Sequence, residues 1–189
     1  MKTIHIFILF IVVAIAQIFV PINMIFGKED ILAKGQLYKF KTRPIDPADP
    51  FRGRYIALDF EVGLYVTKDS TWQRGEDLYI YLETDSLGYA KVSKISRVLL
   101  PNEKKNFVNA KARWYNKQSK ELNIQYPFNR YYMEETKAYD AEVAVRNAHQ
   151  DSLIDTYALV YVKVGEAVLD DVIVNNISIK DYVKKMGVK

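Results

Sequence analysis

Apolar and polar residues alternate one by one along much of the chain after residue 36, the pattern of β-strands with one buried face. Four stretches show it most clearly, residues 56–62, 78–82, 108–114 and 122–128. Their apolar positions are Ile56, Leu58, Phe60 and Val62, then Leu78, Ile80 and Leu82, then Val108, Ala110, Ala112 and Trp114, and finally Leu122, Ile124, Tyr126 and Phe128. Each stretch predicts a half-buried strand.

Two further elements are predicted nearer the C-terminal end. The apolar runs YALVYVKV and AVLDDVIV flank Gly165-Glu166, and glycine supplies the positive backbone angle that a tight hairpin needs. Apolar residues recur at three- and four-residue spacing within residues 134–150, at Ala138, Ala141, Val145 and Ala148. This spacing predicts a helix. The predicted fold class is therefore mainly β (α+β), with one antiparallel β-rich domain and a single helix.

Residues 4 to 26 do not alternate. These 23 positions carry no formal charge with His5 neutral and are interrupted only by His5, Gln17, Pro21 and Asn23. A helix of about 20 apolar residues spans the roughly 30 Å hydrocarbon layer of a membrane, so the segment predicts a transmembrane helix. We divide the chain into a membrane anchor at 1–26 and one β-rich domain at 27–189.

A cleaved signal peptide is the alternative. Lys2 would supply its charged start, and Ala14-Ile15-Ala16 its small-residue cleavage pattern. The apolar character resumes after Gln17, which a cleaved leader does not need, and this favours a retained single-pass anchor. A short leading tail with one lysine is the usual start of an exported chain. We therefore expect the bulk of the chain outside the cytoplasm, although the lysines that follow the segment oppose this orientation.

Composition excludes several classes of function. The chain has no cysteine, which excludes disulfides, thiolate nucleophiles and cysteine-bound zinc. The formal net charge is +4 without a basic run, so nothing indicates a nucleic-acid partner. His149 is the only histidine outside the apolar segment, and neither a nucleophile-elbow motif nor a phosphate-binding glycine motif occurs. We expect no metal, no cofactor and no enzymatic activity.

Paired carboxylates are the remaining candidate chemistry. Asp59 and Glu61 would project from one face of a strand about 6.5 to 7 Å apart, which fits an acid and base pair or a hard cation. The same alternation turns that face away from Leu58 and Phe60 and toward water. We favour solvated side chains, because carboxylates with shifted pKa values lie in clefts.

The stretch RPIDPADPFRGRYIALDF, residues 43 to 60, joins a loop rich in proline and aspartate to a strand. Prolines fix their own backbone angles and extend the residues before them, and glycine permits a sharp turn into the strand. Aspartates before proline cap turns, and each neighbouring arginine can bridge one of them. We interpret the loop as a rigid corner that can also serve as a binding surface, formed by Asp46, Asp49, Arg52, Gly53, Arg54 and Tyr55.

Gly53, Tyr55 and Leu58, preceded by this loop, resemble the bacterial membrane-anchored family named for its motif G-D-Y-x-x-L-x-Y. Two later segments, PFNRYYMEE and VKVGEAVLDDVIVNN, are similar to later parts of that family. Arg54 stands where the family has aspartate, and Phe60 where it has tyrosine. The resemblance implies an anchored, exported, β-rich domain with no assigned activity.

Two functions are expected. The first is a membrane-anchored, non-catalytic envelope module that binds a membrane or envelope partner, such as a membrane protein, through residues 43–54. The alternative is a hydrolase-like or signal-peptidase-like scaffold, because the Gly-x-Tyr-x-x-Leu strand is similar to a strand of those folds. In them a serine precedes the glycine by eight positions. Ile45 occupies that position here, so such a scaffold would lack its nucleophile.

Overall fold

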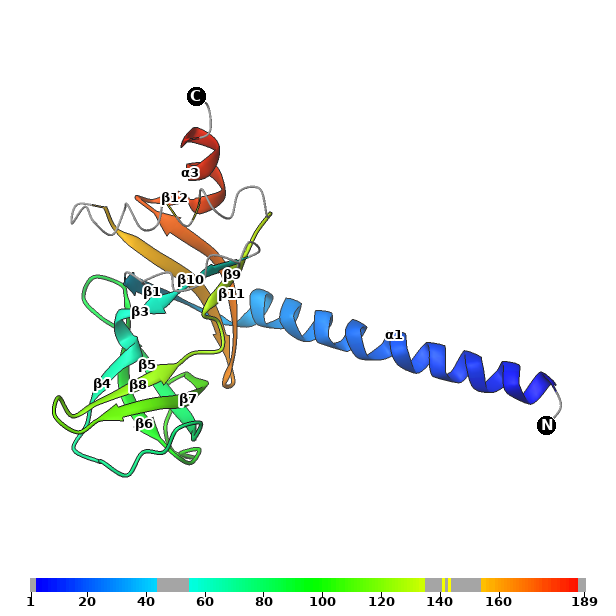
Figure 1. The fold of residues 1–189 in the computed structure, drawn as a ribbon, viewed down its shortest axis with the longest axis horizontal. Helices are drawn as coiled ribbons and strands as arrows, with labels where there is room; N and C mark the ends of the chain where they lie inside the picture. Colours follow the sequence, from blue (N-terminus) through cyan, green and yellow to red (C-terminus); the bar gives the residue numbers. More distant parts are fainter. Residues whose placement is uncertain (1–2, 44–54, 135–140, 142, 144–153, 187–189) are drawn as a thin grey trace.

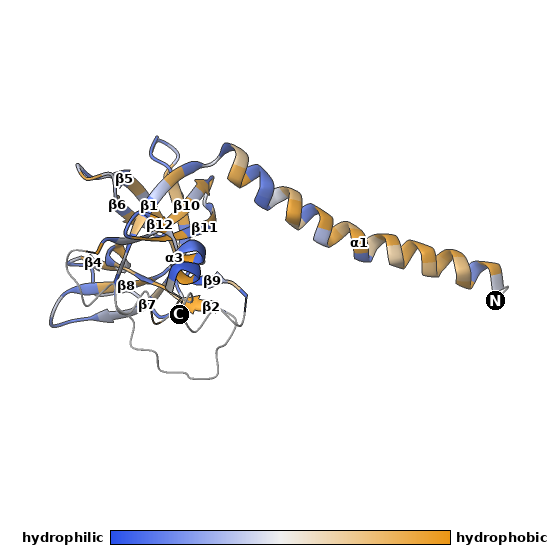
Figure 2. Cartoon of the chain, turned by 90° about the horizontal axis from the view of Figure 1, so that it is seen from above, coloured by the Kyte–Doolittle hydropathy of each residue, from blue (hydrophilic) through white to orange (hydrophobic). Residues whose placement is uncertain are grey.

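The computed structural model describes residues 3–43, 55–134, 141, 143 and 154–186 (Figure 1). A long helix, α1 (Thr3–Lys34), projects from a β-rich body and continues past the predicted end of the anchor at residue 26. It is the one helix in the described ranges that is long and apolar enough to cross a membrane. Apolar residues cover most of its length (Figure 2).

The body contains two five-stranded sheets and a two-stranded ribbon, and all the named strands pair antiparallel. The first sheet has the order β12 (Ile177–Ser178), β11 (Glu166–Val174), β10 (Thr156–Lys163), β1 (Gln36–Arg43) and β3 (Asp59–Phe60). The second has the order β4 (Leu64–Val66), β8 (Glu121–Gln125), β7 (Phe107–Asn116), β5 (Asp77–Thr84) and β6 (Ala90–Ser96). The ribbon consists of β2 (Tyr55–Ala57) and β9 (Arg130–Tyr132). The predicted fold class is confirmed.

One apolar core joins the two sheets and the ribbon. The predicted inward positions that are buried in it are Ile56, Leu58, Phe60, Leu78, Ile80, Leu82, Val108, Ala110, Ala112, Leu122, Ile124, Tyr126 and Phe128. The period of two therefore identified the core-facing side of these strands, because successive side chains of a strand point to opposite faces.

Two positions that were predicted to face inward are not fully buried. Trp114 is 44% exposed because β7 shifts register between Ala112 and Trp114, and one extra residue turns the following side chain to the other face. Val62 is only partly buried because the chain leaves β3 after Phe60 and forms the 3₁₀ helix η1 (Glu61–Gly63). The single strand predicted over 56–62 is therefore two short strands and a helical turn.

The hairpin predicted near the C-terminal end is confirmed, with its turn one residue earlier than predicted. Lys163 pairs with Glu166, so the turn residues are Val164 and Gly165, with φ of 48° and 84°. Gly165 also contacts the second sheet: its N–H donates to the carbonyl oxygen of Phe107 at 3.2 Å, and its own carbonyl oxygen accepts from a β7 N–H at 2.8 Å. The hairpin turn thus joins the two sheets.

Helical structure also occurs outside α1. The helix predicted within 134–150 lies largely outside the described residues. Two of its residues, Ala141 and Val143, are described; both are helical, and Ala141 is fully buried. The C-terminal helix α3 (Ile179–Met186) was not predicted. It buries Ile179 and Val183, which share a face at a spacing of four.

The last turns of α1 dock onto the β10–β11 hairpin. Ile31 is buried, and the carboxylate of Asp30 forms an ion pair with Lys163. On the same side, the Nζ of Lys28 lies 3.9 Å from the carboxylate of Glu166. These contacts give the body a defined orientation relative to the helix that leaves it.

Candidate functional site

The stretch rich in proline and aspartate, predicted to be a loop, lies in the sequence between Arg43, the last residue of β1, and Tyr55, the first residue of β2. Five of the six predicted site residues lie outside the described residues, namely Asp46, Asp49, Arg52, Gly53 and Arg54, and so does Ile45. Tyr55 is described. The site is therefore built from the residues that flank the loop.

The first flank is the end of β1, where Arg43 forms an ion pair with Asp59 of β3. They are partners across β1 and β3, and the Nη2 and Nε of Arg43 lie 2.7 Å and 2.8 Å from Oδ2 of Asp59. The other carboxylate oxygen of Asp59 accepts the N–H of Phe60 at 2.9 Å. Glu61 begins η1, and its Oε1 lies 3.2 Å from the Nζ of Lys41, so the two carboxylates pair with different basic side chains.

The second flank is the β2–β9 ribbon, in which Tyr55 lies opposite Tyr132 and Ala57 opposite Arg130. The rings of Tyr55 and Tyr132 are 5.5 Å apart between centroids, at an interplanar angle of 58°. The guanidinium carbon of Arg130 lies 4.9 Å from the centroid of the Tyr55 ring. We call Tyr55, Arg130 and Tyr132 the ribbon cluster.

The ribbon cluster is open to solvent. Tyr132 is 65% exposed, Arg130 is exposed and Tyr55 is half-buried. A hydrogen bond with Tyr132 raises the pKa of Arg130 above its already high ordinary value, so the side chain stays charged. Exposed tyrosines beside a guanidinium bind partners by stacking, by cation–π contact and by hydrogen bonds to carboxylates, and such residues dominate the energy of many interfaces.

Tyr131 faces inward from the same strand and fixes the ribbon. It is 4% exposed, and its hydroxyl donates to Oδ1 of Asp171 in β11 at 2.8 Å. The same oxygen accepts the N–H of Val172, and the amine of Lys180 lies 5.7 Å from the centre of the Tyr131 ring. Burial, and then the neighbouring Asp171 carboxylate, raise the pKa of Tyr131 far above its ordinary value. Its hydroxyl therefore remains a protonated donor.

The three segments that resemble the family meet at this place. The motif supplies β2, PFNRYYMEE supplies β9, and VKVGEAVLDDVIVNN supplies Asp171 in β11. The pairing of Ile56 with Tyr131, together with the bond between Tyr131 and Asp171, connects all three. Segments far apart in the sequence thus form one surface and its support.

Phe60, where the motif has tyrosine, is 1% exposed. Its ring lies 5.5 Å from that of Phe40, 6.0 Å from that of Tyr126 and 5.4 Å from that of Phe128, between centroids. A ring without a hydroxyl suits this position, because a buried hydroxyl would need a hydrogen-bond partner. The departure from the motif therefore affects the core and not the exposed surface.

Arg130 and Tyr132 were not predicted as site residues. A signal for them was available in PFNRYYMEE, because a strand over Arg130-Tyr131-Tyr132 places the first and third side chains on one face. The pattern could not show that the partner of this strand would be the motif strand, since the two segments are far apart in sequence.

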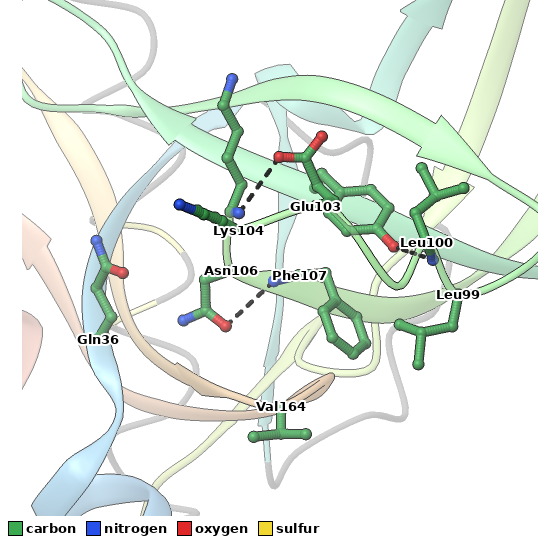
Figure 3. Close-up of a pocket in the computed structure, with 10 residues that line it drawn as sticks. Gln36, Leu99, Leu100, Glu103, Lys104, Asn106, Phe107 and Val164 are labelled. Atoms are coloured by element: carbon green, nitrogen blue, oxygen red, sulfur yellow. Dashed lines mark hydrogen bonds between the residues drawn. The ribbon is translucent and has the colours of Figure 1, made fainter.

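A concave feature lies beside Gln36, the first residue of β1 (Figure 3). It is a hollow of about 330 Å³ whose wall includes Gln36, Leu99 and Val164. The Tyr81 hydroxyl in its wall accepts the N–H of Leu100 at 2.8 Å. The side chain of Asn106 accepts from Phe107 at 3.1 Å and donates to Val162 at 3.0 Å. These polar groups hold the loop between β6 and β7 in place, so we assign the hollow a structural role.

No group of three His, Asp or Glu side chains that could hold a metal ion occurs among the residues that the structure describes. Comparison with curated proteins and with solved structures gives no match. A family model described as GDYXXLXY protein matches residues 17–172, from near the middle of α1 into β11. The match covers most of the chain, which therefore belongs to the GDYXXLXY family.

Proposed function

We propose that the protein is a membrane-anchored, non-catalytic envelope module that binds a membrane-protein partner through the ribbon cluster and the adjoining loop. In this proposal α1 is the anchor and the bulk of the chain lies outside the cytoplasm. The observation that carries the proposal is the pairing of β2 with β9, which places Tyr55, Arg130 and Tyr132 together on an exposed surface at the end of the motif loop.

The position of the ribbon supports a partner in the same membrane. In Figures 1 and 2, β9 lies at the edge of the body on the side toward which α1 extends. The contacts of Ile31 and Asp30 hold the body in one orientation on the helix. A protein embedded beside α1 therefore meets this edge of the body without a rearrangement.

The chemistry of the ribbon cluster favours a partner surface that offers a carboxylate beside an apolar or aromatic group. The guanidinium of Arg130 is at an exposed position and lies over the ring of Tyr55, 4.9 Å from its centroid. A partner carboxylate can take the bidentate geometry that guanidinium groups prefer. The two tyrosine rings supply rigid contact area next to it.

The proposal is tested by photocrosslinking of the full chain in native membranes. A benzophenone amino acid replaces Tyr132 in one variant and Leu87 in a matched control; Leu87 is 77% exposed in the turn between β5 and β6. We expect a discrete adduct with a membrane protein from position 132 and none from position 87.

A substitution of Arg130 then tests whether its guanidinium takes part in binding the partner. Arg130→Ala should remove most of the adduct, whereas Arg113→Ala, at an exposed position of β7, should leave it unchanged. Identical adducts from positions 132 and 87 would show contact by random collision. An adduct that survives Arg130→Ala would show that the ribbon cluster is not the recognition surface.

A further inference from the structure

Gln17 is a polar residue in the middle of the apolar segment of α1. It lies two positions from the centre of residues 4–26, about 3 Å along the helix axis. Its side chain is exposed, as is almost every residue of α1 before Asp30, and it makes no hydrogen bond within the described part of the chain. Its carboxamide has two donor hydrogens and an acceptor oxygen that lipid hydrocarbon cannot satisfy.

The residues around Gln17 form a seam on one side of the helix. Phe10, Ala14, Gln17, Pro21 and Met24 follow one another at spacings of four, three, four and three, the repeat of two helices that pack along their length. Ala14, one turn from Gln17, is small enough to let another helix approach closely. The opposite face carries the apolar side chains of Val12, Phe19 and Phe26 and no polar side chain at these positions, which suits contact with lipid.

We propose that α1 pairs in parallel with α1 of a second copy of this chain, and that the two Gln17 carboxamides hydrogen-bond to each other. Every copy inserts in the same orientation, so a second copy always presents its Gln17 at the same depth. The carboxamide both donates and accepts, so two of them satisfy each other across a two-fold axis. This inference rests on the proposed anchoring by α1 and is independent of the ribbon cluster.

The chain outside the apolar segment is compatible with such a pair. Lys28 continues the seam four residues after Met24, where the two copies would bring like charges together. Each Lys28 lies 3.9 Å from Glu166 of its own chain, and both side chains are more than half exposed. The neighbouring carboxylate and the solvent therefore reduce the repulsion between the two lysines.

The chain has no cysteine, so disulfide crosslinking can locate the seam directly. Single cysteines are placed in the full chain at Ala14 and Met24 on the seam and, as matched controls, at Val12 and Phe19 on the opposite face. Native membranes are oxidised, and the products are separated without reductant. We expect covalent dimers from Ala14→Cys and Met24→Cys and only monomer from the two controls.

A second substitution tests the carboxamide. In the Ala14→Cys chain, Gln17→Leu should lower the crosslinked fraction by about threefold to tenfold, the range expected for an interhelical hydrogen bond in a membrane. Gln17→Asn should keep most of it. Leucine is more apolar than glutamine, so it does not impair insertion of the anchor.

Three outcomes would overturn the pairing: equal crosslinking from both faces, no effect of Gln17→Leu, or an adduct whose mass shows a different protein. Extraction of the same membranes with carbonate separates this failure from failure of the anchor. Release of the chain by carbonate would show that α1 is not inserted in the membrane, and pairing of two inserted α1 helices would then be excluded as well.

Discussion

Tyr131 of β9 donates its hydroxyl to Asp171 of β11 at 2.8 Å, although the two residues are 40 positions apart in the chain. The bond matters because β9 and β2 have only three residues each. A two-stranded ribbon is marginally stable by itself and needs another element to pack against. The ribbon cluster is thus held in place by a residue on the opposite face of its own strand.

Removing this hydroxyl should weaken the fold moderately. Tyr131→Phe keeps the ring and deletes one hydrogen bond to a carboxylate, which should lower the free energy of unfolding by about 1 to 2 kcal/mol. For a domain of this size that corresponds to a melting temperature lower by about 2 to 8 °C. The matched control is Tyr79→Phe, because the hydroxyl of Tyr79 has no hydrogen bond in the described part of the chain. Equal melting temperatures for the two variants would contradict the role assigned to Tyr131.

Two glycines with similar backbone angles should respond differently to the same substitution. Gly165 and Gly88 have φ of 84° and 87°, so alanine is strained at both. A methyl group at Gly88 meets nothing within 4 Å, whereas one at Gly165 lies 2.6 Å from the side chains of Phe107 and Asn109. We expect Gly88→Ala to lower the free energy of unfolding by about 1 kcal/mol and Gly165→Ala by about 2 to 4 kcal/mol.

Chemical denaturation of the full chain in detergent measures both changes. The difference between the two variants isolates the close contact of the hairpin turn with β7 from the backbone strain that they share. Similar losses at the two positions would mean that the junction between the sheets adjusts to the methyl group. The hairpin turn at Gly165 would then not be a rigid link between the two sheets.

Local periodicity predicted which strand positions are buried, and it was wrong where the ladder is irregular. Trp114 follows a register shift in β7. Tyr81 is an exception of another kind: the alternation at residues 78–82 places it on the outer face, yet it is 1% exposed because the segment between β6 and β7 covers it, with the N–H of Leu100 donating to its hydroxyl at 2.8 Å and the Phe107 ring 5.7 Å away between centroids. A bulge depends on the partner strand, which the local sequence does not identify. The helix α3 escaped prediction because so short a helix is stabilised by packing of Ile179 and Val183 more than by propensity.

The candidate site was predicted only in part, because it also depends on pairing between distant strands. The motif identified Tyr55 and the loop before it, but Arg130 and Tyr132 join Tyr55 only through the β2–β9 pairing. Asp59 was expected to be solvated, and its bond to Arg43 depends on the pairing of β1 with β3. Contacts between distant segments thus account for the residues that sequence reasoning missed.

The loop between β4 and β5 should show a pH-dependent stability. Hydrogen bonds from Thr71, and then from Arg97, lower the pKa of Asp69 from an ordinary 3.8 to about 2. Because the folded pKa is depressed, this stabilisation is present above about pH 4 and is lost as the pH falls toward 2. The guanidinium carbon of Arg97 lies 3.7 Å from the centre of the Trp72 ring, so tryptophan fluorescence reports the state of this cluster.

The measurement uses a Trp114→Phe background, which leaves Trp72 as the single tryptophan. Denaturation midpoints between pH 6 and pH 2 should fall more steeply with acid in this chain than in the same chain with Asp69→Asn. Added salt should reduce the difference, because the side chains concerned are at the surface. Parallel curves for the two chains would show that Asp69 does not contribute to the acid dependence.

The membrane orientation can be read from single cysteines in the otherwise cysteine-free chain. Ser70 and Ser119 are exposed and lie between strands, so a cysteine at either position should be reactive without disturbing the fold. If the body lies outside the cytoplasm, both should react in intact cells with a thiol reagent that cannot cross the inner membrane. A cysteine at Thr3, at the other end of α1, should react only after permeabilisation. The reverse pattern would place the body in the cytoplasm, and a soluble mature chain that begins at Gln17 would replace the anchor with a cleaved leader.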